Sequence, residues 1–344
     1  MSRLFDNWMK IGIVLLSLYV ASQVTSVLLP VITAIVLTFI LNPLVNYFCR
    51  LRFPSMNWRI TKGTAIFLAF SCFILLLGIA VTFVVLPFIH EFNKFVLDLP
   101  ALMDKFDKVI SSFGSILNEV TVPTRFAAMI EQITTNIAAI LPKLASGAAS
   151  SIITFATRTI ELVVVPILTY YFLKDWQLLR GSFLTIFKVK NRDKVAAVID
   201  EMANVISGYI RGQFIVSIVI GAMVFCGMYF LNVGYPLVLG LLATLTESIP
   251  IIGPIIGAVP AILLAYLISP TLSLKVLLFF IIIHQVENNI VVPKVMGHTI
   301  ALHPAIIIIS LLVGGQLFGV AGLILAVPVT ALLKVLLKHI WFHQ

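Results

Sequence analysis

The chain has 344 residues, of which 60% are hydrophobic and only 11% are charged. Soluble proteins carry about 25% charged residues, so this composition excludes an ordinary soluble globule and indicates an integral membrane protein. The net charge of +9 does not indicate nucleic-acid binding, because the 23 Lys and Arg residues are spread between apolar segments instead of gathering on one face.

Five segments clearly reach the length of about 20 mostly apolar residues that a membrane-crossing helix needs. They cover roughly residues 11–29, 31–48, 63–89, 151–173 and 208–231. Pro30 is expected to form the turn of a tight hairpin between the first two helices. No small-residue cleavage site separates these two segments, so the first is predicted to be an uncleaved helix and not a signal peptide.

Residues 90–150 are predicted to form an extracytoplasmic helical insert. Lys and Arg concentrate in the other short loops and at both ends, which places both termini in the cytoplasm, whereas the insert has five basic and six acidic residues. Apolar residues recur at helical spacing over 92–113, where Pro100 could introduce a bend, and over 126–144. These amphipathic helices could lie on the bilayer, cover a neighbouring subunit or form a lid. A third amphipathic stretch, 195–206, is expected to continue into the fifth membrane helix.

The C-terminal region has interrupted apolar segments. Residues 235–250 and 254–269 would each form about 24 Å of helix, which is shorter than the ~30 Å hydrocarbon core. A segment over 272–292 follows, and glycines and Pro328 interrupt the last one, 303–338. Eight crossings with a re-entrant hairpin and ten without one both keep the two termini on the same side.

These segments predict an all-α, polytopic membrane protein that forms a single transporter domain. In this scheme residues 1–89 contain three helices, 90–150 the extracytoplasmic insert, and 151–344 the remaining helices with the broken segments.

Two acidic residues, Glu247 and Glu287, are the only ones between residue 202 and the C-terminus. A charge at the centre of a membrane helix costs about 2.5–3.5 kcal/mol on insertion scales, so an intramembrane acid is a functional candidate. Glu247 precedes a Gly/Pro-rich break of the kind that marks binding sites in secondary transporters. Two plainer interpretations stay open: Glu287 could lie in the headgroup zone, and Glu247 could hold the break through backbone amides.

The predicted substrate- or ion-binding site combines these acids with neighbouring polar groups and helix breakers. Glu247 and Glu287 are expected to carry a proton or cation. The neutral hydrogen-bonding groups are Gln285, Asn288 and Asn289, and the residues that break the helix and free carbonyl groups are Pro250, Gly253 and Pro254. Gly314 and Gly315 are expected to allow close packing of helices or to act as a hinge.

Signatures of catalysis are missing from the sequence. It has no phosphate-binding GxxxxGK[ST] loop, no HExxH pair and no GxSxG elbow. The three cysteines, Cys49, Cys72 and Cys226, are far apart and have no histidine partner at metal-binding spacing. We therefore expect no enzyme activity, no cofactor and no metal site.

Several motifs resemble those of the AI-2E family of permeases. They are Gly208-Tyr209-Ile210-Arg211-Gly212-Gln213, Glu247-Ser248-Ile249-Pro250 with Gly253-Pro254, Gln285 with Glu287-Asn288, Pro293, Met296-Gly297, Leu302-His303-Pro304, Gly314-Gly315 and Gly319-Val320-Ala321-Gly322 through Ala326-Val327-Pro328-Val329. The resemblance implies a multi-pass protein of the bacterial inner membrane with about eight helices that forms a homo-oligomer. Members have been linked to export of autoinducer-2 or to exchange of sodium or lithium for protons, and the shared motifs do not separate these activities.

The leading hypothesis is a secondary transporter in the lipid bilayer that works by alternating access. It would export a small hydrophilic solute, such as a signalling molecule, or exchange a monovalent cation for protons. The alternative from another class is a membrane scaffold or regulator that transports nothing and binds a partner through the outer insert. A passive channel is a third option, which uphill transport would exclude.

Overall fold

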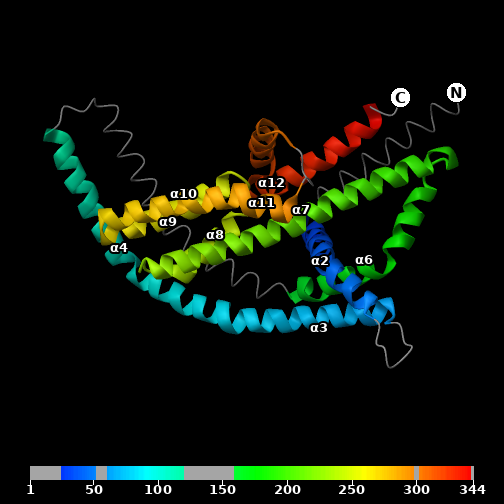
Figure 1. The fold of residues 1–344 in the computed structure, drawn as a ribbon, viewed down its shortest axis with the longest axis horizontal. Helices are drawn as coiled ribbons and strands as arrows, with labels where there is room; N and C mark the ends of the chain where they lie inside the picture. The colour runs from blue at the N-terminus through cyan, green and yellow to red at the C-terminus, as the bar shows by residue number, and fades with distance from the viewer. Residues whose placement is uncertain (1–24, 52–59, 120–158, 298–301, 342–344) are drawn as a thin grey trace. The chain divides into compact units, whose positions relative to one another are not determined.

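The computed structural model describes residues 25–51, 60–119, 159–297 and 302–341, and within these ranges every regular element is a helix (Figure 1). The elements are α2 (Thr25–Arg50), α3 (Lys62–Ala80), η1 (Val81–Val85), α4 (Leu86–Glu119), α6 (Thr159–Thr185), α7 (Val189–Phe230), α8 (Pro236–Thr246), α9 (Ile252–Ile268), α10 (Pro270–Val286), η2 (Glu287–Val291), α11 (Val292–Met296) and α12 (Pro304–Trp341). The two η elements are π-helical turns.

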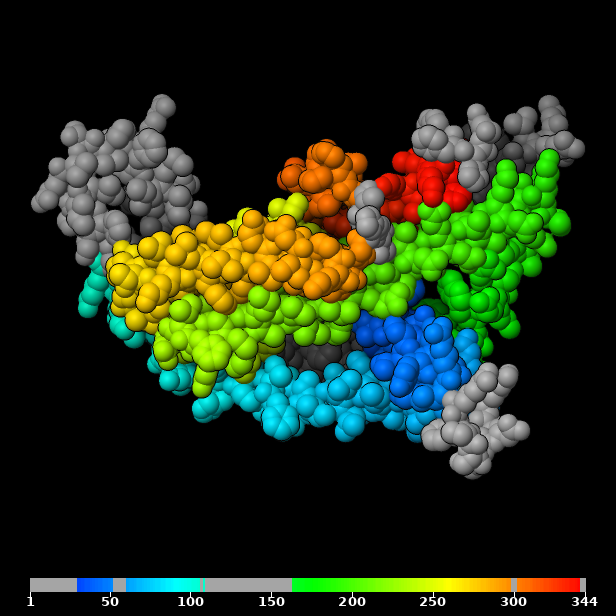
Figure 2. Space-filling view, viewed as in Figure 1, coloured from blue at the N-terminus to red at the C-terminus, as the bar shows by residue number. Residues whose placement is uncertain are grey.

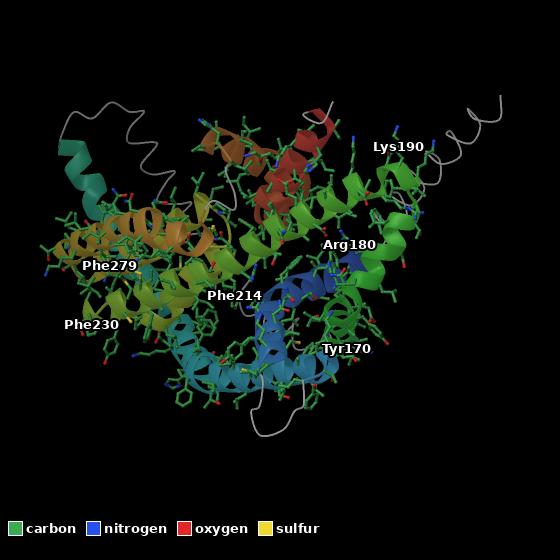
Figure 3. All side chains as sticks on the ribbon, turned by 45° about the vertical axis from the view of Figure 1, so that its right-hand side comes forward. Tyr170, Arg180, Lys190, Phe214, Phe230 and Phe279 are labelled. Carbon is green, nitrogen blue, oxygen red and sulfur yellow. The ribbon has the colours of Figure 1, made fainter. Side chains whose placement is uncertain are left out.

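Five helical segments among the described residues are long and apolar enough to cross a membrane. They are Pro30–Arg50, Lys62–Lys105, Val189–Phe230, Pro270–Met296 and Pro304–Ile340, and α8 and α9 are shorter apolar helices. Large apolar side chains on their outer faces are exposed; Phe230 at the end of α7, for example, is 78% exposed (Figure 3). Such faces are typical of helices that contact lipid, so the prediction of an all-α polytopic membrane protein is confirmed.

The chain divides into two compact units, which are described separately. The first comprises Met1–Ile74 and Ala156–Ala196, and the second comprises Leu75–Phe155 and Ala197–Gln344. The single transporter domain inferred from the sequence stays a prediction.

In the first unit, α2 packs against α6 around a core of small and branched side chains. This core contains Leu41, Val45, Ala65, Ile66, Ala69 and Leu173, with Tyr170 of α6 partly buried against it (Figure 3). The buried hydroxyl of Thr169 donates to the carbonyl of Val165 at 2.8 Å and lies 3.3 Å from that of Ala34 on α2. A hydroxyl that bonds to its own helix and also reaches the neighbouring one satisfies a polar group inside an apolar interface.

Pro30 does not interrupt this unit, because α2 continues through it from Thr25 to Arg50. The prediction that Pro30 forms the turn of a hairpin is therefore wrong. Proline fixes φ near −65°, a value that an α-helix also adopts, and membrane helices tolerate the loss of one backbone hydrogen bond. Most of the first predicted helix, 11–29, lies outside the described residues.

The amphipathic helix predicted over 92–113 is confirmed, since α4 covers this range. Pro100 lies inside α4 and does not end it. Phe92 and Phe95 on its apolar face are buried in the core of the second unit. The second amphipathic helix of the insert, 126–144, falls outside the described residues.

The second unit is built around α7, a helix of 42 residues. It contains both the amphipathic stretch 195–206 and the predicted fifth membrane segment, so their continuity is confirmed. The core joins α7 to α9 and α10, which lie beside it in Figure 2, through Val216, Ile220, Val224, Met228, Ala261, Leu264, Ala265, Val276, Phe280 and Ile283. Glycines allow close contact: the ring of Phe279 occupies the space that a side chain at Gly227 would need.

Two helical hairpins complete this unit. In the first, α8 and α9 pack against each other on either side of the break at residues 247–251. In the second, α12 turns sharply at Gly319 (φ 58°, ψ −136°), so that its two arms meet. The backbones of Gly314 and Gly322 touch, and Thr330 donates a 2.7 Å hydrogen bond to Ser310.

Each hairpin has at least one arm that is shorter than the ~30 Å hydrocarbon core. The 11 residues of α8 extend about 16 Å, and residues 304–318 extend about 22 Å. These lengths favour hairpins that enter the bilayer without crossing it.

Candidate functional site

The break between α8 and α9 brings a buried acid into the centre of the second unit. Glu247 caps the C-terminus of α8 and is 3% exposed. The side-chain amide of Gln213 on α7 donates to its backbone carbonyl at 2.6 Å. Ile251, which precedes α9, has a φ of 69°, a value that is strained for a β-branched residue. The break is therefore a defined, strained conformation that α7 holds in place.

Glu287 lies in the π-helical turn η2 and is 8% exposed. His284, one turn earlier, places Nδ1 2.9 Å from its carboxylate oxygen Oε2. The single-turn widening of a helix that η2 represents is frequent at functional sites, because it changes the direction of the side chains that follow. Glu287 is thus packed within the protein, and its depth in the bilayer stays as open as the sequence left it.

The two acids meet. The carboxyl groups of Glu247 and Glu287 lie close enough to interact electrostatically. Two ionised carboxylates repel each other in a low-dielectric interior, so a proton or a cation between them would be favourable. The structure therefore brings together two buried acids from separate parts of the chain, which we call the carboxyl pair.

The predicted neutral groups do not join this pair. Gln285, Asn288 and Asn289 are exposed in the chain, and the Asn289 amide donates to the Gln285 carbonyl at 2.8 Å. Gln285 and Pro254 instead line a groove of about 500 Å³ between α9 and α10, whose walls are mostly apolar. The binding role assigned to these three residues stays a prediction.

The predicted helix breakers have separate structural roles. Pro250 lies in the turn, and the amide of Gly253 donates to the Ile249 carbonyl at 2.8 Å. A side chain at Gly253 would collide with the backbone carbonyl of Thr246, so glycine is needed for the two arms to pack. Pro254 lies in the first turn of α9, where its missing N–H costs nothing.

The second hairpin packs directly on the break. Ile249 is buried against Leu311 and Ala326, one from each arm of α12. Gly314, predicted as a packing or hinge residue, lies where the two arms touch, and Gly315 faces the flexible side chain of Leu323. The turn itself is at Gly319. The two hairpins therefore contact each other two residues from Glu247.

Sequence reasoning missed Gln213 and His284 as parts of the site. Gln213 appeared only within a motif, and no local pattern connects it to a carbonyl 34 residues away. The spacing of His284 to Glu287, i to i+3 on one helical face, could have suggested the contact that is observed.

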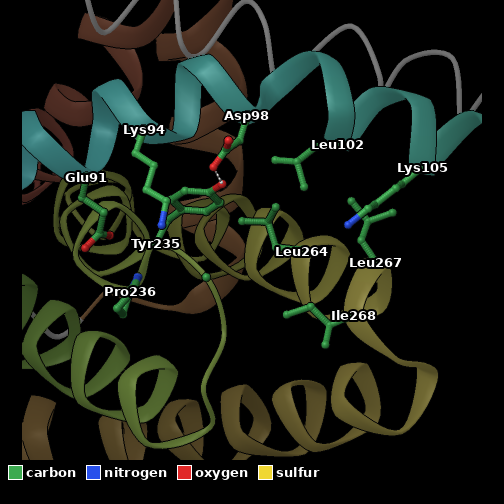
Figure 4. Close-up of a pocket in the computed structure, with 11 residues that line it drawn as sticks. Glu91, Lys94, Asp98, Leu102, Lys105, Tyr235, Pro236, Leu264, Leu267 and Ile268 are labelled. Atoms are coloured by element: carbon green, nitrogen blue, oxygen red, sulfur yellow. Dashed lines mark hydrogen bonds between the residues drawn. The ribbon is translucent and has the colours of Figure 1, made fainter.

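A second polar cluster joins α4 to the start of α8 around a cavity of about 380 Å³ (Figure 4). Tyr235 donates to Asp98 at 2.6 Å, and the amides of Leu237 and Val238 donate to Glu91 Oε1 at 2.8 and 3.0 Å. Burial, together with the hydrogen bond to Asp98, raises the pKa of the Tyr235 phenol above its ordinary range. A carboxylate at a helix N-terminus is favourable, so α4 fixes the first arm of the hairpin that carries Glu247.

Comparison with known proteins identifies the family. The model of the AI-2E family transporter matches residues 11–341. The chain belongs to the AI-2E transporter family. This confirms the resemblance seen in the motifs, and it makes the chain a membrane transport protein. The AI-2E motifs of α7, the break, η2 and α12 converge on the carboxyl pair and on the two hairpins around it.

Three relatives illustrate the range of names among similar AI-2E proteins. "Putative transport protein YueF" of Bacillus subtilis is 27% identical over 96% of this chain and 92% of its own length. YrrI of the same organism, whose name carries the same description, is 36% identical over 56% of this chain and 55% of its own length. A protein of Halobacillus andaensis named "Sodium-lithium/proton antiporter" is 24% identical over 93% of this chain and 91% of its own length.

Proposed function

We propose that this AI-2E transporter exchanges a monovalent cation for protons at the carboxyl pair formed by Glu247 and Glu287. The observation that carries the proposal is the close approach of these two buried acids. When both acids are ionised, two neighbouring carboxylates lie in a low-dielectric interior, where their attraction for a cation is strong. Because proton and cation would need the same oxygens, binding of one would displace the other, which is the basis of exchange.

The size of the site favours an ion over an organic solute. Glu247 and Glu287 are 3% and 8% exposed, and neither lines the two cavities described above. A small cation needs only a few oxygen ligands, whereas a hydrophilic organic molecule would need a cavity with several polar groups. The name of the Halobacillus relative agrees with the ionic alternative.

The surrounding hairpins would supply alternating access. Both have short arms and a glycine- or proline-containing turn, and Ile251 and Gly319 adopt conformations with positive φ. Such broken helices surround the sites of secondary transporters, where they move relative to the rest of the protein. We further propose that the protein is an inner-membrane homo-oligomer with both termini in the cytoplasm, as the Lys and Arg distribution and the family motifs suggest.

The test is proton movement in proteoliposomes that contain a pH-sensitive dye, measured after jumps of sodium, lithium or potassium. Wild type is compared with Glu247→Gln and Glu287→Gln, which keep the side-chain shape and remove the titrating group. Glu201→Gln is the matched control, because Glu201 pairs with Lys338 at 2.8 Å and lies outside the carboxyl pair. We expect a cation-driven proton flux that both site variants lose and the control keeps.

The outcomes separate the alternatives. A wild-type protein that moves no protons with any of the three cations would rule out cation–proton exchange. Solute export and a scaffold role would then be the remaining hypotheses. Site variants that retain wild-type flux would remove the pair from the mechanism. Flux that cannot run against its own gradient would indicate a passive channel. Thermal unfolding of each variant confirms that a loss of flux does not come from misfolding.

A further inference from the structure

Two buried hydroxyl groups on α7 have no hydrogen-bond partner within the described part of the chain. They are Tyr209 Oη and Ser217 Oγ, and both residues are 5% exposed. An unpaired buried hydroxyl lowers stability, so proteins usually pair such groups with protein atoms or with ordered water. These two atoms therefore mark places where a polar molecule other than the chain itself would bind.

The serine is unusual among the helical hydroxyls of this protein. Thr38 donates to the carbonyl of Ala34, and Ser310 donates to that of Ile306, each four residues earlier in its own helix. This local bond is the ordinary way to satisfy a hydroxyl inside a membrane helix. Ser217 does not make it, so its hydroxyl is left available to another partner.

Both hydroxyls lie on the face of α7 that meets the carboxyl pair. Tyr209, Gln213 and Ser217 are spaced at i, i+4 and i+8, which places them on one side of the helix over about 12 Å. The middle residue donates to the Glu247 carbonyl. Tyr209 and Ser217 therefore lie one turn on either side of the contact between α7 and the break.

Packing on both sides supports this placement. Gly221, one turn beyond Ser217, lies against Thr244, so Ser217 is level with the last turn of α8, where Glu247 follows. Gly212 lies against the side chain of Met296 in α11, the helix that follows η2. The same face of α7 thus borders the elements that carry both acids.

A third unpaired atom lies on the residue that contacts Glu287. His284 bonds to Glu287 through Nδ1, and its Nε2 is buried with no partner among the described residues. Unpaired polar atoms thus occur on both α7 and α10, the helices that border the acids.

We propose that the α7 face carrying Tyr209 and Ser217 is the wall of a hydrated passage to the carboxyl pair, in which the two hydroxyls bind the water molecules that accompany a proton or monovalent cation. The inference rests on the proposed exchange at Glu247 and Glu287. A hydroxyl both donates and accepts hydrogen bonds, so it can order water and pass a proton without becoming charged. Ordered water also keeps a small cation solvated between the surface and the acids.

The first test is Tyr209→Phe and Ser217→Ala in the proton-flux assay. Each change removes one hydroxyl and leaves the packing nearly intact. We expect each to slow cation-driven proton flux by about tenfold, the effect of one lost hydrogen bond on the barrier. The unfolding temperature should stay the same or rise, because an unpaired buried hydroxyl is gone. A purely structural role would lower the unfolding temperature and leave flux unchanged.

Two matched controls define the specificity of the effect. Tyr229→Phe removes an exposed hydroxyl from the same helix. Ser273→Ala removes a buried hydroxyl that does have a partner, the Ile262 carbonyl at 3.2 Å. We expect wild-type flux from both, and a lower unfolding temperature only for Ser273→Ala. Wild-type flux in both Tyr209→Phe and Ser217→Ala would overturn the proposed passage.

The second test detects the water directly and does not depend on transport. Radiolysis generates hydroxyl radicals from water bound inside the protein, and mass spectrometry then identifies the residues that react. We expect labelling of Tyr209 in liposomes, and none of Met228, which is fully buried in the apolar core. An unlabelled Tyr209 would overturn the passage. If wild type exchanges no cation for protons, the proposed function is wrong. The labelling of Tyr209 then still decides whether the hydrated passage exists.

Discussion

The side-chain amide of Gln213 donates a 2.6 Å hydrogen bond to the backbone carbonyl of Glu247. This contact ties the long helix α7 to the point where α8 ends. The carbonyl groups at the end of a helix have no partner in that helix, and a buried one needs a donor from elsewhere. Gln213 supplies that donor at the residue whose carboxyl group faces Glu287.

Gln213→Leu should therefore destabilise the protein by about 1–3 kcal/mol, because the buried carbonyl loses its partner while the side-chain volume is nearly kept. The change should also reduce transport, since the position of Glu247 is no longer held. Thermal unfolding in detergent and the proton-flux assay measure the two effects. Gln316→Leu, at an exposed position of α12, is the control and should unfold like wild type. Equal stability of the two variants would show that the hydrogen bond is unimportant.

The sequence predicted the parts of this site better than their arrangement. Apolar segments and their interruptions located the helices and the break near Pro250, because burial in lipid demands long apolar runs. The scarcity of acids then selected Glu247 and Glu287. Their contact with each other, and with Gln213, depends on how separate helices pack, which no local spacing encodes.

Polarity alone does not predict which side chains around Glu287 face the interior. Gln285, Asn288 and Asn289 follow the same polar pattern as Glu287, yet they are exposed while Glu287 is buried. The π-helical turn that starts at Glu287 changes the helical register, and the sequence gives no sign of it. Pro30 misled for a related reason, since a proline has the same φ inside a helix as in many turns.

The sequence assigned Gly314 and Gly315 the same role in helix packing or hinge motion, but the structure gives them different surroundings. A side chain at Gly314 would collide with the backbone carbonyl of Gly322 on the opposite arm, which cannot move without opening the hairpin. One at Gly315 would meet only the flexible end of Leu323. We expect Gly314→Ala to cost about 1–3 kcal/mol, the range for overpacking a tight interface, and Gly315→Ala to cost clearly less. Chemical denaturation of the two variants side by side measures the difference, and equal costs would contradict the hairpin contact.

Glu91 should stabilise the start of α8, because its Oε1 accepts hydrogen bonds from the amides of Leu237 and Val238. Glu91→Ala removes the acceptor and the negative charge, and should cost about 0.5–2 kcal/mol, as the loss of a helix cap does. Glu91→Gln keeps an acceptor oxygen and should cost less. Asp104→Ala, at an exposed acid of the same helix, should stay within about 0.5 kcal/mol of wild type. Unfolding temperatures that are lowest for Glu91→Ala, higher for Glu91→Gln and highest for Asp104→Ala would support the cap. A Glu91→Ala protein that unfolds at the wild-type temperature would exclude it.

Tyr235 should make the stability of the second unit depend on alkaline pH. Burial and the hydrogen bond to Asp98 raise the pKa of its phenol above the ordinary value of 10.0. The folded protein therefore holds the phenolic proton more tightly than the unfolded chain does. The resulting stability is complete below pH 10 and is lost as the pH rises from there towards the higher folded-state value. Tyr235→Phe removes this dependence, so its unfolding temperature should fall less steeply than that of wild type between about pH 9 and pH 11. Tyr229→Phe, which removes an exposed phenol of α7, should follow the wild-type curve, and identical curves for all three proteins would show that the Tyr235 phenol is not held by Asp98.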